Sequence, residues 1–260
     1  MKQSKKDIYA AFGIEYNAET GKILAPRFGW ISPLLIDGNT KLGKGVWTFS
    51  TLAGNFPYTV IIDGKPEQVY GTCACNCTGC YAQTGNYRWN NVIFSNAVKT
   101  ILSREHSDFV RRAITAQIKA DKIKLCRIHA SGDFFNREYI NVWRAIVAAC
   151  PDCLFWTYTK NANAENAFDD LQNINIVRSI IPGYGFNFGH CDYILRVYRE
   201  LKALGKRVYI CRCGIDKNQH CTNCRGCAEN EIVLFVEHST KYNAEKDPYF
   251  AELKAVIENQ

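Results

Sequence analysis

Hydrophobic and polar positions follow two different periods along the chain. Runs rich in β-branched and aromatic residues predict strands at 45–50 and 58–63, with the turn residues "NFP" and "DGK" beside the second run. A short helix is predicted ahead of them, near the amino terminus. From residue 95 onward, stretches with helical periodicity alternate with short apolar runs.

This alternation predicts an α/β fold. Helices are predicted at 95–121, 137–150, 163–172 and 191–205, and strands at 122–133, 153–160, 174–181, 206–213 and 232–238, the first of these running into a glycine-containing turn. Strands separated by helices of this length indicate right-handed βαβ units and a parallel sheet. We therefore expect a partial or open parallel (β/α) barrel.

Three segments are predicted from the change in pattern. Residues 1–70 form an N-terminal β-rich extension, 71–210 the α/β core, and 211–260 a C-terminal cysteine-rich metal-binding module packed on that core. A length of 260 residues with 47% hydrophobic content is enough for one large core and a small appendage.

The chain carries 13 cysteines. No run approaches the roughly 20 apolar residues of a membrane-spanning helix, so we expect a cytoplasmic protein with no membrane partner. In a reducing compartment, cysteines at this density bind metal or catalyse more often than they form disulfides. An odd number would also strand one thiol in a fully paired scheme.

The first cysteine group is "YGTCACNCTGCYAQTG", residues 70–85. Cys73, Cys77 and Cys80 have the spacing CxxxCxxC, which suits three irons of a cubane cluster and leaves the fourth iron open. Zinc more often uses two separated CxxC pairs. Cys75 is an additional thiol, and its use as a fourth ligand would close the site and favour a structural or redox role.

In this spacing the chain resembles the radical S-adenosylmethionine (radical SAM) enzymes, whose CxxxCxxC loop follows the first strand of a partial parallel barrel. The resemblance implies a [4Fe-4S] cluster on Cys73, Cys77 and Cys80, with S-adenosylmethionine on the open iron. It also implies reductive cleavage of that cofactor, with electrons from a reductant such as flavodoxin or ferredoxin. The chain departs from the family at Gly79, where an aromatic residue is common.

Polar residues at strand ends are candidate cofactor ligands. Ser131, Gly132 and Asp133 resemble the family's Gly-Gly-Glu-like turn, which contacts the amino group of S-adenosylmethionine. The alternative is a strand-to-helix turn with an aspartate near the helix N-cap. Lys160 and Arg178 follow or end later strands, where ligands bind in parallel α/β folds, and are further candidates.

A second cysteine group lies in "CRCGIDKNQHCTNCRGC", residues 211–227. Its candidate metal ligands are Cys211, Cys213, Cys221, Cys224 and Cys227. We favour Cys211, Cys221, Cys224 and Cys227, with Cys213 as the ambiguous fifth. Closely spaced thiolates can hold a second [4Fe-4S] cluster or zinc. His220 could replace one thiolate, although an exposed loop histidine is the simpler interpretation.

Several motifs in one order also resemble the phage gene product 88-like proteins of bacteriophages and mobile elements. They are "GTCACNCTGCYA", "RIHASGDFF", "EYINVW", "FWTYTK" and "CRCGIDKNQHCTNCRGC". This resemblance implies a phage-related protein acting in the host cytoplasm, and it implies no particular reaction.

Two functions follow from these patterns. The first is a radical SAM-type iron–sulfur enzyme that cleaves S-adenosylmethionine and acts on an unidentified substrate. The second is a non-catalytic iron–sulfur or zinc protein that binds nucleic acid or a protein partner in phage or mobile-element biology. The net charge of +7 and the aromatic residues at 86–91 favour the second function.

Overall fold

The computed structural model describes residues 3–38, 42–74, 77, 80–216, 219–236 and 243–260. A mixed five-stranded sheet lies at the centre, in the order β10-β9-β8-β5-β4. Its strands are β4 (Ile36–Asp37), β5 (Val46–Thr48), β8 (Leu125–Ile128), β9 (Leu154–Thr159) and β10 (Ile174–Arg178). In this sheet the neighbouring strands β5, β8, β9 and β10 are parallel to one another, and β4 is antiparallel to β5.

Parallel pairing brings the carboxyl ends of these strands to one edge. Val46 pairs with Leu125, and Leu125 pairs with Leu154, so strands from distant parts of the sequence share one register. Among the described residues the sheet is open and closes no barrel. The fold is mixed α/β with several small sheets, and the partial parallel barrel stays a prediction.

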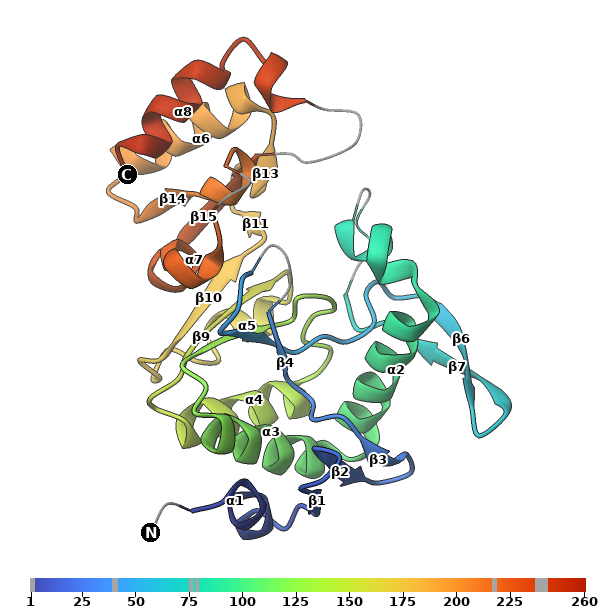
Figure 1. Cartoon of the computed structure of the whole chain (residues 1–260). Helices are drawn as coiled ribbons and strands as arrows, with labels where there is room; N and C mark the ends of the chain where they lie inside the picture. Colours follow the sequence, from blue (N-terminus) through green and yellow to red (C-terminus); the bar gives the residue numbers. More distant parts are fainter. Residues whose placement is uncertain (1–2, 39–41, 75–76, 78–79, 217–218, 237–242) are drawn as a thin grey trace.

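Helices pack beside the central sheet (Figure 1). They are α1 (Lys5–Ala11), α2 (Asn90–Glu105), α3 (Ser107–Asp121) and α4 (Arg137–Ala149). Near α1 lies a three-stranded sheet of β1 (Tyr16–Asn17), β2 (Lys22–Ala25) and β3 (Gly29–Ile31). The hairpin of β6 (Pro57–Ile62) and β7 (Lys65–Tyr70) packs beside α2.

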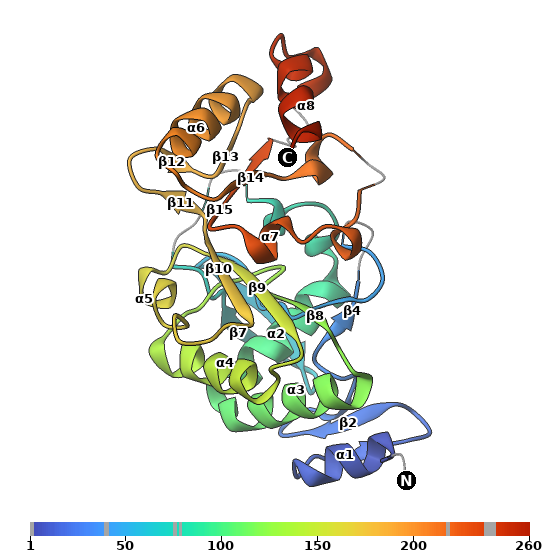
Figure 2. The same cartoon turned by 90° about the vertical axis from the view of Figure 1, so that its left-hand side faces the viewer.

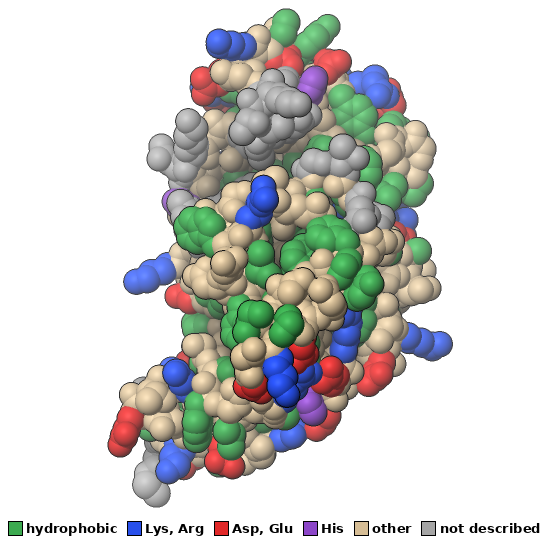
Figure 3. Space-filling view, turned by 90° about the vertical axis from the view of Figure 1, so that its right-hand side faces the viewer, with side chains coloured by type: hydrophobic (Ala, Val, Ile, Leu, Met, Phe, Trp, Pro, Cys, Tyr) green, Lys and Arg blue, Asp and Glu red, His purple; other side chains and the backbone are tan. Residues whose placement is uncertain are grey.

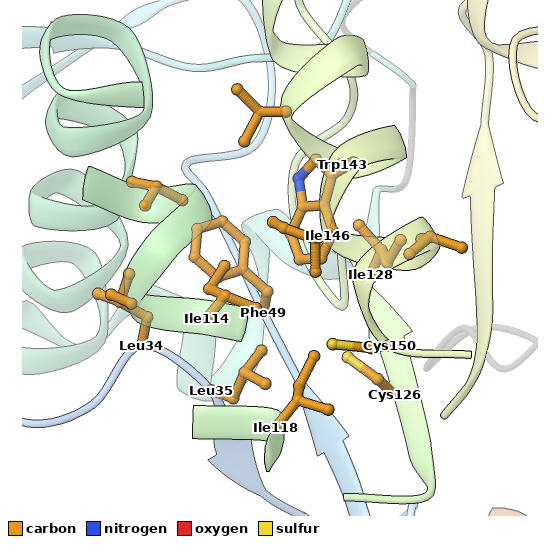
Figure 4. Packing of buried hydrophobic residues seen from close by; sticks show 14 of the residues in the cluster. Leu34, Leu35, Phe49, Ile114, Ile118, Cys126, Ile128, Trp143, Ile146 and Cys150 are labelled. Atoms are coloured by element: carbon orange, nitrogen blue, oxygen red, sulfur yellow. The ribbon is translucent and has the colours of Figure 1, made fainter. Parts of the chain in front are cut away.

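The main core lies between the central sheet, α3 and α4. Phe49, Ile114, Ile128 and Trp143 are fully buried there, and Figure 4 shows their side chains converging from different elements. Phe49 contacts Trp143 edge to face, with ring centroids 5.4 Å apart. Burial of large apolar side chains is the main stabilising term for this part of the fold.

The C-terminal part has its own core at the opposite end of the molecule (Figure 2). It comprises α6 (Cys191–Ala203), α8 (Phe250–Glu258) and a sheet of β13 (Phe188–Gly189), β15 (Ile232–Val236) and β14 (Val208–Ile210). The remaining short elements are α5 (Ala162–Glu165), β11 (Ile180–Ile181), β12 (Gly185–Phe186) and α7 (Gly226–Glu229). Short 3-10 turns occur at Tyr81–Gln83, Gly85–Arg88, Arg212–Gly214, Cys221–Asn223 and Ala244–Lys246. No helix in the described ranges combines the length and the apolar character needed to cross a membrane.

Most predicted elements are confirmed, with three differences. The predicted helix 95–121 divides at His106, whose φ of −136° lies outside the helical region. The predicted helix 163–172 is helical only in α5, because Arg144 of α4 bonds the Ala167 carbonyl and Asp170 and draws the following residues onto α4. The predicted strand 174–181 divides into β10 and β11.

Candidate metal and cofactor site

The first cysteine group directly follows β7. Cys73, Cys77 and Cys80 are half-buried, whereas Cys75 lies outside the described residues, as does Gly79. Backbone hydrogen bonds fix the start of this segment: the Cys73 N–H donates to the Gly54 carbonyl over 3.0 Å. The segment after β5 therefore positions the first predicted ligand.

Gly71 is required just before this group. A Cβ atom at position 71 would lie 2.2 Å from the carbonyl oxygens of both Ala53 and Gly54, which is far inside contact distance. The close approach allows the Thr72 N–H to donate to the Leu52 carbonyl over 2.9 Å. A side chain here would push the cysteine segment away from the sheet.

Burial and neighbouring charges set the state of the thiols. Burial raises the pKa of Cys73 to about 12, and the charges of Asp133 and Cys80 act in the same direction, while that of Lys160 opposes them. Burial also raises the pKa of Cys80, with Lys160 again opposing it. These thiols are neutral without a bound metal, and metal binding would have to displace their protons.

The predicted turn at Ser131–Asp133 packs against the segment after β5. Gly132 has a φ of +85°, and a Cβ atom there would lie 1.9 Å from the Thr51 Oγ1 atom. The Thr51 N–H donates to the Ser131 carbonyl over 3.0 Å, and the Ser131 hydroxyl donates to the Thr51 carbonyl over 2.9 Å. Packing against Thr51 thus explains both the glycine and the serine.

Asp133 is buried, with 4% of its surface exposed. Its carboxylate accepts hydrogen bonds from the Thr159 hydroxyl (2.6 Å), the Lys160 N–H (2.9 Å) and the Phe134 N–H (2.8 Å). Burial raises the pKa of Asp133, and these hydrogen bonds oppose the rise. The carboxylate therefore ties the turn after β8 to the end of β9.

The structure brings two of the predicted cofactor residues to the cysteines and separates another. Asp133 and Lys160 interact electrostatically with Cys73. Arg178 stands opposite Thr159 in the β9–β10 register, but its guanidinium pairs with Glu165 over 3.0 Å. This ion-pair partner belongs to α5 and lies outside the cysteine group.

The second cysteine group surrounds one small cavity. It is lined by Leu125, Trp156, Cys211, Cys213, Cys221, Cys224, Arg225, Cys227 and Ala228. All five predicted ligands therefore converge on one place, although 16 residues of sequence separate the first from the last. No set of three or more His, Cys, Asp or Glu side chains within the described ranges is already arranged as a metal site.

Four of these five thiols interact with one another: Cys211 with Cys213 and Cys227, and Cys213 with Cys221. The Cys224 sulfur instead lies 3.1 Å from the Tyr209 hydroxyl. A set of soft sulfur donors of this kind fits zinc or an iron–sulfur cluster.

Three polar side chains that sequence reasoning missed link these regions. The Tyr81 and Tyr87 hydroxyls both donate to the Ala130 carbonyl, over 2.6 and 3.3 Å, and Arg127 donates to the Tyr81 hydroxyl over 3.0 Å. Tyr81 directly follows Cys80, which is a signal that the sequence offered. Arg127 is a half-buried residue between two buried residues of β8, and its position in the strand was the only sequence signal that could have identified it.

His129, at the end of β8, is a buried structural residue in this arrangement. Its φ of +58° is unusual for a residue with a side chain, and its Nε2 atom lies 2.9 Å from the Tyr139 hydroxyl. Burial lowers the pKa of His129 to about 3, with Arg127 contributing in the same direction. The imidazole is therefore neutral at physiological pH. At His220, the Nδ1 atom is buried without a hydrogen-bond partner among the described residues.

Hydrophobic side chains gather on the face formed by α2 and the β6–β7 hairpin (Figure 3). Exposed large side chains on and beside these elements include Ile61, Tyr70, Tyr81, Trp89 and Phe94. The first cysteine group thus lies beside a surface with an apolar character.

Comparison with known proteins identifies relatives among bacteriophages. A protein called "Gene 88 protein" from Mycobacterium phage D29 is 31% identical over 106 residues, which cover 36% of this chain and 42% of that protein. The "Gene 88 protein" of Mycobacterium phage L5 is 36% identical over 106 residues, with the same coverage. The match spans about two fifths of each relative's length, and no solved structure matches the chain.

The family comparison covers a larger part of the chain. The model of the family described as "Gene product 88" matches residues 33–183, which include the first cysteine group, the turn after β8 and the strands from β4 to β10. The second cysteine group lies beyond the matched residues. Because the match extends over more than half of its length, this chain belongs to the Gene product 88 family.

Proposed function

We propose that this protein is an iron–sulfur enzyme of radical SAM type, with a [4Fe-4S] cluster on Cys73, Cys77 and Cys80. The observation that carries the proposal is that Cys73 interacts electrostatically with both Asp133 and Lys160, and Cys80 with Lys160. The sequence selected the thiols and the two charged residues by separate arguments.

The chemistry of these residues fits the group. Three thiolates suit three irons of a cubane and leave one iron for a ligand. When bound, such a cluster supplies one electron for the reductive cleavage of S-adenosylmethionine. The class of reaction that follows is removal of a hydrogen atom from a substrate.

The surrounding residues would hold the cofactor and the loop. The Lys160 amine offsets the negative charge of thiolates at positions 73 and 80. The Asp133 carboxylate, already fixed by Thr159 and the Lys160 N–H, presents oxygen atoms that can accept from an ammonium group. Because these partners fix its position before a ligand binds, little reorganisation is needed.

The C-terminal cysteines would hold a second metal centre. Five thiols that line one cavity supply enough donors for a second [4Fe-4S] cluster or for zinc. The alternative function, a non-catalytic metal protein that binds nucleic acid or a protein, rests on this site and on the exposed aromatic residues near α2.

The test begins with anaerobic purification, followed by measurement of iron, sulfide and zinc. EPR spectra of the reduced protein are then recorded with and without S-adenosylmethionine. A [4Fe-4S] signal that changes with S-adenosylmethionine is expected, because an open iron can bind the cofactor. Cleavage of S-adenosylmethionine by the reduced protein is the second expected readout.

Matched variants assign the signal to the first group. Cys77→Ala is expected to lose the responsive signal, and Cys150→Ala, which removes a buried thiol from the main core, is expected to keep it. Zinc alone, or a cluster indifferent to S-adenosylmethionine, would refute the enzyme. Salt-sensitive binding of DNA or RNA by such a protein would support the alternative.

A further inference from the structure

Arg127 lies between the two cysteine groups. It is a half-buried residue of β8, and its guanidinium donates to the Tyr81 hydroxyl over 3.0 Å. On another side, its Cζ atom lies 5.0 Å from the centre of the Tyr158 ring, a cation–π distance. The two tyrosines therefore hold one guanidinium from two directions.

Each tyrosine is connected to a different cysteine group. Tyr81 directly follows Cys80 in the first group. Tyr158 packs in the same side-chain clusters as Cys227 of the second group, and the two side chains interact electrostatically. Arg127 also interacts electrostatically with Cys221 and Cys227. A single side chain thus adjoins both predicted metal centres.

Among the residues that the structure describes, no carboxylate pairs with the charge of Arg127. None of the ion pairs found within the described ranges includes Arg127, and its Nε atom is buried without a hydrogen-bond partner there. Burying a cation is costly unless an anion lies close by. Thiolate-bound metal centres carry negative charge and would supply that anion on both sides.

We propose that Arg127 is a positioning residue that couples the two cysteine-bound centres electrostatically and stabilises the reduced form of each. The inference rests on the proposed function, because it requires metal centres at both groups. Reduction adds a negative charge to a cluster, and a fixed cation between two clusters favours that added charge at either one. Through Tyr81 and Tyr158, the same cation also orients the two loops.

The test is an EPR-monitored redox titration of the purified holoprotein and two variants. Arg127→Met removes the charge and keeps a long apolar side chain, and it is expected to lower the reduction potential of both clusters. We expect at least a tenfold change in each reduction equilibrium, or about 59 mV for a one-electron couple. Arg127→Lys, which keeps the charge, is expected to remain closer to the wild-type potentials.

Two tyrosine variants separate the halves of the coupling. Tyr158→Phe removes the hydroxyl that interacts with Cys227 and is expected to lower the potential of the C-terminal cluster alone. Tyr81→Phe is expected to lower that of the first cluster alone. Both variants keep the positive charge of Arg127. They therefore serve as the test if Arg127→Met does not retain its clusters. If the C-terminal cysteines hold zinc, only the reduction potential of the first cluster is measured, and the test depends on that value alone.

The outcomes distinguish this inference from the proposed function. Full iron content with unchanged potentials in Arg127→Met would overturn the coupling and leave the iron–sulfur enzyme standing. If Arg127→Met cannot be purified with iron, unchanged reduction potentials in both tyrosine variants would likewise overturn the coupling and leave the iron–sulfur enzyme standing. A wild-type protein without iron–sulfur clusters would overturn both proposals.

Discussion

The Tyr81 hydroxyl donates a 2.6 Å hydrogen bond to the carbonyl oxygen of Ala130. This bond joins the residue after Cys80 to the residue before the Ser131–Asp133 turn. It therefore fixes the first cysteine group against the end of β8, and two segments about 50 residues apart in sequence form one site.

Removing this hydroxyl should loosen the cysteine segment. Tyr81→Phe is expected to lower the free energy of unfolding by about 1–2 kcal/mol, because the hydroxyl donates to Ala130 and accepts from Arg127, and each hydrogen bond usually contributes about 1 kcal/mol. Tyr87→Phe should have a smaller effect, because its hydroxyl donates to the same carbonyl over 3.3 Å. Urea denaturation of the metal-free protein measures both.

The double variant gives the sharper result. With both hydroxyls removed, the Ala130 carbonyl loses both side-chain donors, so the combined loss should exceed the sum of the single losses. Strict additivity in the double-mutant cycle would show that the shared carbonyl has another donor.

Gly132 should tolerate no side chain. Gly132→Ala combines a φ of +85° with a Cβ atom 1.9 Å from Thr51 Oγ1, and a loss of about 3 kcal/mol is expected from the backbone strain and overpacking together. Gly183→Ala is the matched control, since its φ of +80° is similar and nothing lies within 4 Å of the added atom. Equal losses, measured by thermal unfolding, would contradict the contact with Thr51.

His129 should make the fold sensitive to acid. Its pKa is lowered to about 3 in the folded protein by burial and by Arg127, from an ordinary value of 6.5. Between these values the unfolded chain binds more protons, so stability is present above pH 6.5 and is lost as the pH falls toward 3. The expected slope reaches about 1.4 kcal/mol per pH unit.

The His129→Asn variant tests this slope, because asparagine tolerates a positive φ. It should be less stable at pH 7 but should lose less stability between about pH 6.5 and pH 4 than the wild type. Parallel curves for the wild type and His129→Asn would show that His129 is protonated in the folded state.

Lys99 should weaken the fold at neutral pH. It is 5% exposed, its Nζ atom has no hydrogen-bond partner within the described residues, and burial lowers its pKa to about 8. Lys99→Met is expected to stabilise the protein by roughly 1–3 kcal/mol at pH 7, because it removes the cost of burying the ammonium group. Chemical denaturation of both proteins measures this gain.

The stability gained by Lys99→Met should shrink as the pH rises. Between pH 8 and 10.5 the unfolded chain holds the Lys99 proton more tightly, so the stability of the wild type recovers relative to that of the variant as the pH rises. Lys119→Met is the matched control: both ammonium groups lie over an aromatic ring, Lys99 5.9 Å from the centre of Phe49 and Lys119 5.2 Å from that of Phe12, but Lys119 is exposed. A constant difference across this pH range would show that Lys99 keeps its ordinary pKa.

Local pattern was sufficient to predict many elements but not their exact lengths. The helix Arg137–Ala149 and the strand Leu154–Thr159 follow closely from periodicity and side-chain type. The end of α5 did not follow from periodicity, because Arg144 reaches 23 residues along the chain to bond the Ala167 carbonyl. Contacts of that range override local helical preference.

The candidate metal ligands follow from the chain alone, because CxxxCxxC and the consecutive CxxC steps are local patterns. The surroundings of these cysteines depend on the fold. It placed Asp133 and Lys160 beside Cys73, paired Arg178 with Glu165, and set Arg127 between two tyrosines. The physical reason is that parallel pairing of β5, β8, β9 and β10 brings distant strand ends to one edge, and burial there fixes the contacts and the proton affinity of each group.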